Sequence, residues 1–284
     1  MAIKLIIGLI VAVVALAAMV RAIEPGFAFF PAAGESTTPT AFGVPFDAST
    51  IQTSDGERLR GWALPHPTPR ALVVYFHGNG GNLSAWTPIL VGVQRHGYAV
   101  RAIDYRGYGA STGQPSERGL YRDVDAAIEW ARTAAPRDVP IVYWGRSLGT
   151  AMAAYAATRR RPDGLVLEAG FRDARSLFRA SAPLAFLSLF SSYRFPTAQF
   201  ASAARCPVLV IHGDQDHVIP FEAGRALFDA VPEPKQFVTI RDGDHNDATP
   251  ADPQTYWTAV DAFMASLVIS HWSLVFRRPM TNDQ

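Results

Sequence analysis

Residues 141–157 read IVYWGRSLGTAMAAYAA. The first four residues are apolar and β-branched or aromatic, which favours a strand buried on both faces. The alanine-rich residues from Leu148 onward favour a helix. Between them, the pattern G-x-S-x-G at residues 145–149 permits a cramped strand-to-helix turn. Such a turn would present the hydroxyl of Ser147 at the positive end of the helix, although the same serine could simply cap that helix.

Short apolar runs alternate with helical stretches on both sides of this segment. The predicted strands are residues 71–76, 99–103, 141–144, 164–167, 208–211 and 237–240. The predicted helices are residues 83–96, 117–133, 148–159, 222–231 and 253–267. This alternation implies an α/β fold, a mostly parallel sheet with helices on both faces. Two β-like runs around an Asp55-Gly56 pair, residues 46–53 and 58–64, predict a hairpin before the first parallel strand.

The chain divides into four predicted parts. They are a terminal apolar segment (1–22), a linker rich in proline and glycine (23–45), the main domain (46–268) and a C-terminal tail (269–284). Within the main domain, residues 169–205 are too long for a simple crossover and predict a small cap with residues 184–190 as its apolar centre. Ligands bind at the carboxyl ends of strands in such sheets, so a cap there would cover a pocket. One helix with a long loop is the alternative.

The terminal segment contains an uncharged run, residues 5–20, between Lys4 and Arg21. A helix of that length spans about 24 Å, and both flanking side chains can snorkel to extend it toward the roughly 30 Å of a bilayer core. We expect a single-pass membrane anchor with its amino end in the cytoplasm and the domain outside. A cleaved signal peptide, with residues 15–17 (ALA) as its cleavage site, is the main alternative, and a buried core helix is the third.

Composition excludes several other classes of protein. Lys and Arg total 26 against 25 for Asp and Glu, so there is no broad basic surface for nucleic acid. The single cysteine, Cys206, allows no intrachain disulfide and no cysteine-based metal site, and its apolar surroundings predict a packing role. The chain has no dinucleotide or Walker motif and no metal-ligand spacing, so we expect neither cofactor nor metal. The oligomeric state is left open.

A serine hydroxyl becomes a nucleophile when a base removes its proton and an acid orients that base. Downstream of Ser147, two loops follow predicted strands and carry suitable side chains. The first, in VLVIHGDQDHVIP (208–220), predicts Asp216 as the acid. The second, in FVTIRDGDHND (237–247), predicts His245 as the base. The weaker alternatives are Asp214 and Asp247 for the acid and His217 for the base, while His212 is expected to be structural and His271 lies in the tail.

An oxyanion hole needs two backbone N–H groups close to the nucleophile. Leu148, which follows Ser147, supplies one in this interpretation. The glycine-rich loop HGNGGN, residues 77–82, follows the first parallel strand and can approach a substrate closely. We assign Asn79 as the second donor, with Gly80 as the alternative. The same loop could also be no more than a turn and a helix cap.

The motifs HGNGGN, DYRGYGAS, GRSLGT, CPVLVIHGDQDHVIP and GDHND, taken together, resemble the membrane-anchored α/β hydrolases of the ABHD type over residues 24–268. The resemblance implies Ser147 as nucleophile, Asp216 as acid and His245 as base. It also implies that Asn79 and Leu148 provide the oxyanion hole. The chain departs from this pattern at GDHND, where relatives more often have a small residue before the histidine, and in its basic tail.

The predicted activity is hydrolysis of an ester or thioester through an acyl-enzyme on Ser147. A small molecule or an acyl chain would be the substrate, and the terminal helix would contact a membrane. A serine aminopeptidase is an alternative, in which Glu168 would hold the free amine of the substrate. A catalytically silent, membrane-tethered interaction protein is the non-enzymatic alternative.

Overall fold

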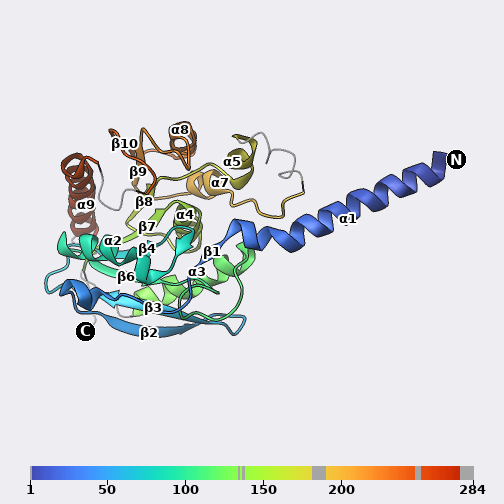
Figure 1. The fold of residues 1–284 in the computed structure, drawn as a ribbon. Helices are drawn as coiled ribbons and strands as arrows, with labels where there is room; N and C mark the ends of the chain where they lie inside the picture. The colour runs from blue at the N-terminus through green and yellow to red at the C-terminus, as the bar shows by residue number, and fades with distance from the viewer. Residues whose placement is uncertain (1, 134, 136–137, 181–189, 247–250, 276–284) are drawn as a thin grey trace, which may run out of the picture.

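The computed structural model describes residues 2–133, 135, 138–180, 190–246 and 251–275. Its centre is an eight-stranded sheet with the strand order β10-β9-β8-β7-β4-β6-β3-β2 (Figure 1). The strands are β2 (Asp47–Gln52), β3 (Arg58–Leu64), β4 (Leu72–Phe76), β6 (Ala99–Ile103), β7 (Ile141–Arg146), β8 (Gly164–Glu168), β9 (Val208–Gly213) and β10 (Lys235–Ile240). All neighbouring strands pair in parallel except β2 with β3 and β3 with β6.

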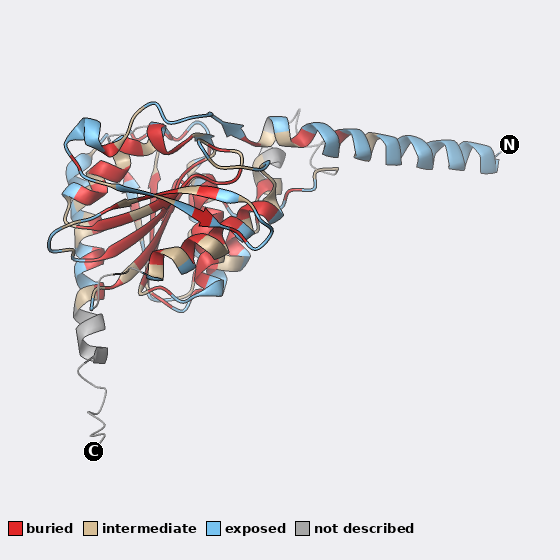
Figure 2. Ribbon diagram, turned by 90° about the horizontal axis from the view of Figure 1, so that it is seen from below, coloured by how far each residue is buried: buried red, intermediate tan, exposed pale blue. Residues whose placement is uncertain are grey.

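Helices cover both faces of the sheet. Those of the main domain are α2 (Leu83–Arg95), α3 (Glu117–Thr133), α4 (Leu148–Arg159), α8 (Phe221–Ala230) and α9 (Pro253–Val275). Residues of α3, α4 and α8 pack into one apolar core, and residues of α2 and α9 into a second one on the opposite face. Alternate residues of β4 pack into the two cores, with Val74 in the first and Val73 in the second. This pattern is expected of a strand that is buried on both faces (Figure 2). The predicted α/β-hydrolase architecture is confirmed.

Helix α1 (Ala2–Ala28) projects away from the domain (Figures 1 and 2). The helical segment of residues 2–26 is long and apolar enough to cross a membrane. Its most apolar stretch has a mean hydropathy of 2.8, and 6% of that stretch is buried. An N-terminal signal sequence has the same features. The helix continues through Pro25 and so includes residues 23–28, which the sequence analysis assigned to the linker. The rest of the linker holds a two-residue strand, β1 (Phe30–Pro31), and a short 3-10 helix, η1 (Pro39–Phe42).

The C-terminal end of α1 contacts the domain. Val20 and Glu24 are buried, and the carboxylate of Glu24 accepts hydrogen bonds from the hydroxyl of Ser191 and from the N–H (2.9 Å) and hydroxyl (2.6 Å) of Ser192. The ring of Phe29, just beyond the helix, packs edge-on against Tyr193 at 5.2 Å between centroids. The docked residues follow the ALA sequence at 15–17, so they would stay with the domain even after signal cleavage.

The interval between β8 and β9, predicted to be a cap, contains two short helices, α5 (Ala174–Ala180) and α7 (Thr197–Ser202). Its expected apolar centre, residues 184–190, lies outside the described residues except for Phe190. At the other end of the domain, α9 continues past residue 267 and includes residues 269–275 of the predicted tail.

Candidate active site

The turn between β7 and α4 has the shape that its glycines predicted. Ser147 has a φ of 55° and a ψ of −122°, a left-handed conformation that costs energy for a residue with a side chain. A Cβ atom on Gly149 would lie 1.9 Å from the carbonyl oxygen of Phe76, and one on Gly145 would lie 2.0 Å from the carbonyl oxygen of Gly149. Only glycine fits at either position, and the tight packing holds Ser147 at the start of α4.

Three loops bring Ser147, His245 and Asp216 together at the carboxyl ends of β7, β10 and β9. The hydroxyl oxygen of Ser147 lies 3.0 Å from Nε2 of His245, and Nδ1 of the same ring lies 2.8 Å from Oδ2 of Asp216. His245 and Asp216 are almost fully buried. The distances allow Nδ1–H to donate to the carboxylate while Nε2 accepts the serine proton, which is the arrangement a base needs in order to activate a hydroxyl.

The surroundings of Asp216 favour its charged form. Burial disfavours the charge, but hydrogen bonds from His212, His245 and the N–H of Ile219 outweigh it and hold the pKa of Asp216 below its ordinary value. His212 had been assigned only a structural role, yet its Nε2 lies 2.9 Å from the carbonyl oxygen of Ile219 and 3.4 Å from the carboxylate of Asp216. This histidine therefore approaches the same carboxylate oxygen, Oδ2, that His245 contacts.

The alternative acids and base lie elsewhere. The carboxylate of Asp214 accepts the N–H of Asp242 at 2.7 Å and so joins the two loops. The side chain of His217 is 78% exposed and pairs with Asp244 at 3.4 Å. Asp247 is outside the described residues. Neither Asp214 nor His217 is among the residues that hydrogen-bond to the serine or to His245.

The loop after β4 lies against the turn that carries the serine. A Cβ on Gly78 would be 3.3 Å from Cβ of Ser147. The hydroxyl of Tyr108 donates to the carbonyl (2.9 Å) and to the side-chain oxygen (3.0 Å) of Asn79, and the Asn79 amide donates to the carbonyl of Ala28 at 2.7 Å. Asn79 and Leu148 line the same cavity as Ser147. Both residues assigned to the oxyanion hole thus border the space above the serine.

A buried network behind the serine was missed by the sequence analysis. The guanidinium of Arg146 donates to the backbone carbonyl of His245 at 2.7 Å and lies 3.6 Å from the carboxylate of Glu168. That carboxylate also accepts hydrogen bonds from Trp144 (3.1 Å) and Tyr256 (3.0 Å). The four side chains come from β7, β8 and α9, so no local pattern in the sequence could have revealed them. They hold the loop of His245 against the serine turn.

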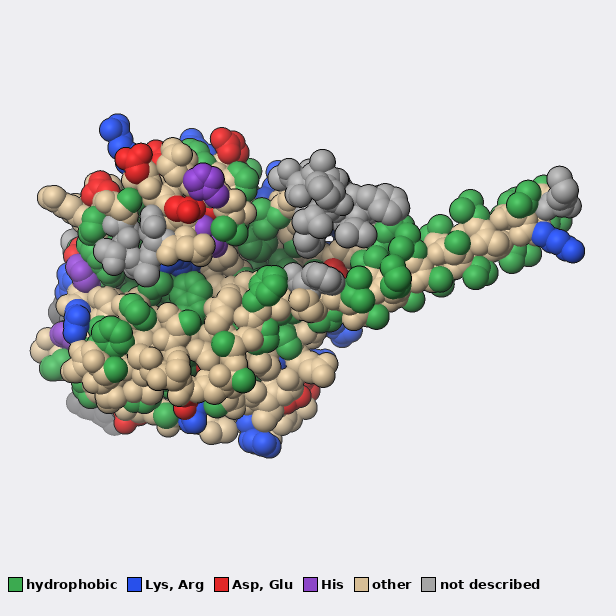
Figure 3. Space-filling model, in the orientation of Figure 1, with side chains coloured by type: hydrophobic (Ala, Val, Ile, Leu, Met, Phe, Trp, Pro, Cys, Tyr) green, Lys and Arg blue, Asp and Glu red, His purple; other side chains and the backbone are tan. Residues whose placement is uncertain are grey.

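The cavity over Ser147 has a volume of about 630 Å³. Its walls are mostly apolar and include Phe171, Leu177, Tyr193 and Phe195 from the interval predicted to be a cap. At its mouth, Phe30 and Val218 are each 57% exposed. Figure 3 shows hydrophobic side chains along α1 and around the hollow where it meets the domain. Among the described residues, none that lines this cavity carries a carboxylate, and no group of three His, Cys, Asp or Glu side chains could hold a metal ion.

A second pair of buried polar groups lies under the loop after β4. Asp104 and His77 are fully buried with 3.6 Å between a carboxylate oxygen and Nε2. Burial raises the pKa of Asp104 to about 7, against the opposing hydrogen bond from the N–H of Leu83, and burial lowers the pKa of His77 to about 4. His77 is therefore neutral near pH 7, and the charged form of Asp104 destabilises the fold.

Replacement of Asp104 by Asn should change how stability depends on pH. The folded-state pKa lies above the unfolded value of about 3.9, so the stabilising protonated form is lost as the pH rises toward 8. The original chain therefore loses stability as the pH rises, whereas the Asp104→Asn variant has no carboxylate to ionise. The difference in free energy of unfolding, variant minus original chain, should grow by roughly 2–3 kcal/mol between pH 5 and pH 8. Urea unfolding in non-ionic detergent measures it. The exposed Asp229→Asn control should show no such trend, and a flat difference for Asp104→Asn would contradict the assignment.

Comparison with protein families gives one matching model, described as "Serine aminopeptidase, S33", over residues 67–203. Protein Rv2307c of Mycobacterium tuberculosis is 32% identical over 246 residues, which cover 85% of this chain and 87% of that protein. Protein YfhR of Escherichia coli is 33% identical over 215 residues, or 72% and 75% of the two chains. The α/β hydrolase domain-containing protein aho-3 of Caenorhabditis elegans is 32% identical over 189 residues, or 64% and 54%.

Solved structures share the fold at low sequence identity. The Pyrococcus furiosus esterase Pf2001 superposes with a TM-score of 0.69 at 18% identity, covering 84% of this chain and 99% of that one. The esterase RhEst1 from a Rhodococcus species gives a TM-score of 0.60 at 18% identity, covering 78% and 99%.

Proposed function

We infer the activity of the protein from its family, because the chain belongs to the α/β-hydrolase superfamily and is a hydrolase of that fold. We propose that it is a serine hydrolase that cleaves carboxylic esters or thioesters. The observation that carries the proposal is the contact of 3.0 Å between the hydroxyl of Ser147 and Nε2 of His245, with Asp216 on the other side of the ring.

The reaction would run through an acyl-enzyme. His245 accepts the proton of Ser147 as its oxygen attacks the carbonyl carbon of the substrate, and Asp216 stabilises the imidazolium that forms. The N–H groups of Leu148 and Asn79 hold the negative oxygen of the tetrahedral intermediate. His245 then gives its proton to the departing alcohol or thiol. Water, activated by the same histidine, releases the acid and restores the serine.

The cavity favours an uncharged acyl group over a peptide with a free amino terminus. An aminopeptidase needs a carboxylate for that amine, and Glu168 had been considered for this role. Glu168 is buried and its oxygens are occupied by Trp144, Tyr256 and Arg146. It borders a separate space of about 30 Å³ behind the acid and base. The mostly apolar lining of the cavity over Ser147 fits the acyl chain of a lipid or another acylated molecule.

We propose further that α1 anchors the protein in a membrane, with the amino end in the cytoplasm and the domain on the opposite side. The apolar length of the helix supports the anchor, and Ala28 and Phe30 support its link to catalysis because both line the cavity that contains Ser147. The mouth of the cavity thus lies beside the end of the helix. An acyl chain leaving the bilayer would have a short path to the serine.

Covalent labelling and substrate comparison test this function together. A fluorophosphonate probe should label the full chain, and peptide mapping should place the label on Ser147. The kcat/KM for p-nitrophenyl esters of medium-chain acids should exceed that for aminoacyl p-nitroanilides by at least about 100-fold, because the cavity offers no charge to the amine. Acyl thioesters of the same chain length show which leaving group is preferred. Faster anilide cleavage would favour a peptidase, and no label would favour a non-enzymatic protein.

A further inference from the structure

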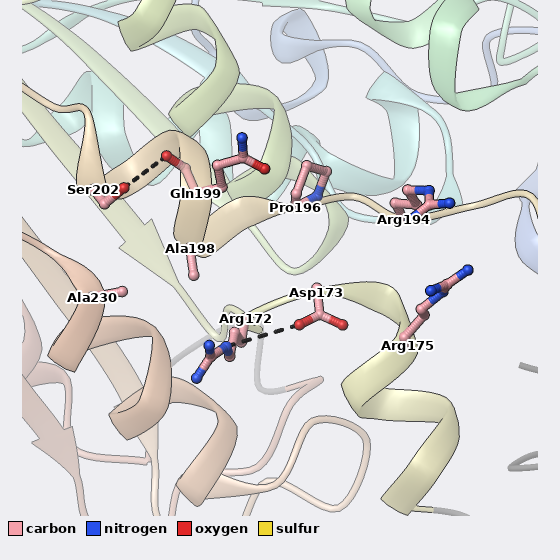
Figure 4. A pocket seen from close by; sticks show the side chains of 9 residues that line it. All are labelled: Arg172, Asp173, Arg175, Arg194, Pro196, Ala198, Gln199, Ser202 and Ala230. Carbon is pink, nitrogen blue, oxygen red and sulfur yellow. Dashed lines mark hydrogen bonds and ion pairs between the residues drawn. The ribbon is translucent and has the colours of Figure 1, made fainter.

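A second cavity, of about 640 Å³, lies between α5, α7 and α8 (Figure 4). Its polar lining consists of Arg172, Asp173, Arg175, Arg194, Gln199 and Ser202. No residue that the structure describes lines both this cavity and the one over Ser147. Three guanidinium groups therefore line a cavity that has no role in the proposed hydrolysis.

The positive charge in this cavity is not balanced by the described residues. Among the described lining residues, Asp173 is the one carboxylate, and it is 3.9 Å from Arg172 and accepts the N–H of Ser176 at 2.8 Å. The side chains of Arg175 and Arg194 make no hydrogen bond or ion pair with any other residue that the structure describes. Nε of Arg175 is shielded from solvent, and no residue that the structure describes accepts a hydrogen bond from it.

Shielded donors without an acceptor are rare in folded proteins, which makes the state of Arg175 informative. Nε of Arg60 and Nε of Arg132 are also shielded without a hydrogen-bond acceptor, but each of these side chains has another partner, the carboxylate of Glu35 at 3.0 Å and the carbonyl of Arg161 at 3.0 Å. Arg106 pairs with Asp55 and Asp123 at 2.9 and 2.8 Å, and Arg146 donates to the carbonyl of His245. An unsatisfied buried N–H costs free energy, and an anion that enters the cavity would remove this cost.

We propose that the cavity between α5, α7 and α8 binds a phosphate group through Arg175 and Arg194, which lie on the same side of it, whereas Arg172 points to the opposite side (Figure 4). A guanidinium offers parallel N–H donors that match two oxygens of a phosphate, and several of them can share one group with multiple oxygens and more than one negative charge. The phosphate belongs either to a soluble phosphate ester or to the head group of an acidic phospholipid. Both present the same oxygens.

The two cavities share the segments that form their walls. On residues 172–177, the arginines face the second cavity whereas Ala174 and Leu177 line the cavity over Ser147. On residues 193–196, Arg194 faces the second cavity and its two neighbours line the first. The N–H of Ala174 donates to the carbonyl of Arg194 at 2.8 Å, which ties the two segments together. A bound phosphate would therefore sit directly behind a wall of the proposed acyl site.

Calorimetric titration of the full chain in non-ionic detergent tests the proposal. The chain carries Ser147→Ala so that binding is measured without turnover, and its result does not depend on the proposed hydrolysis. Inorganic phosphate is titrated in one arm and dihexanoyl phosphatidylglycerol, below its critical micelle concentration, in the other. Dihexanoyl phosphatidylcholine, whose head group has no net charge, is the lipid control. Each arm is repeated with Arg175→Gln, Arg194→Gln and the exposed, charge-matched control Arg58→Gln.

We expect saturable binding in at least one arm, weakened about tenfold or more by Arg175→Gln or Arg194→Gln and changed less than about twofold by Arg58→Gln. Binding of phosphate alone identifies a soluble ester, and tighter binding of phosphatidylglycerol identifies a lipid head group. Thermal unfolding midpoints close to that of the parent chain show that the variants are folded, and Arg175→Lys, which keeps the charge, should retain part of the affinity. The absence of saturable binding in both arms, or equal loss with Arg58→Gln, would overturn the proposal.

Discussion

Replacement of Ser147 by alanine is expected to lower kcat for a p-nitrophenyl ester by roughly 10⁶-fold, because the reaction loses its nucleophile and water must attack the ester directly. The KM should change little, since the apolar walls that bind the acyl group are untouched. Some acceleration over the uncatalysed reaction should persist through the oxyanion donors. Steady-state kinetics on purified protein in detergent measures both constants.

The control for this experiment is Ser54→Ala, in the exposed turn between β2 and β3, which should leave kcat within about twofold of the original value. Residual activity of the Ser147→Ala preparation is checked for inhibition by the fluorophosphonate probe, which separates a contaminating hydrolase from the variant itself. A loss of kcat smaller than about 100-fold would show that another group attacks the ester.

Replacement of Asp216 by asparagine is expected to lower kcat by roughly 10⁴-fold, the size found when the equivalent acid of a serine protease is changed. The side-chain amide of asparagine would donate to Nδ1 of His245 and thereby leave the proton on Nε2. The histidine could then no longer accept the proton of Ser147. The variant should fold, because its side-chain oxygen can still accept the N–H groups of Val218 and Ile219, now at 2.9 and 2.7 Å.

Asp214→Asn is the matched control, two residues away in the same loop. Its side-chain oxygen binds the N–H of Asp242 and does not touch the imidazole, so kcat should fall by less than about tenfold. Fluorophosphonate labelling rates, measured beside kcat, report the nucleophilicity of Ser147 in each variant and should fall in parallel with kcat. Equal losses in Asp214→Asn and Asp216→Asn would contradict the choice of acid.

Much of the fold could be predicted because its determinants are local. The boundaries of β6, α3 and α4 fall on the predicted residues, since apolar runs and helix-favouring segments have clear ends in the sequence. The serine turn could also be predicted, because the carbonyl of Phe76 approaches Gly149 so closely that only glycine fits there, and that glycine is visible in the sequence. The order of loops along a parallel sheet then indicated which acid and which histidine would approach Ser147.

The parts that could not be predicted depend on contacts between distant segments. His212 reads as an ordinary residue at the end of a strand until the loop of Asp216 folds back over it. The network of Arg146 and Glu168 needs Tyr256, almost ninety residues further along the chain. Helix α1 passes Pro25, and Glu24, just before it, is held by Ser192 of the segment predicted to be a cap, a contact between residues 168 positions apart in the chain.

One hydrogen bond joins the N-terminal helix to the loop expected to hold the oxyanion. The carbonyl of Ala28, the last residue of α1, accepts the side-chain amide of Asn79 at 2.7 Å. If α1 spans a bilayer, its inclination responds to the thickness of the lipid around it. The lipid composition would then affect the position of Asn79 and, through it, the rate of the reaction. A soluble form made by deleting the helix would lack the hydrogen bond from Asn79 to Ala28 and hence one of the contacts that position the proposed oxyanion hole.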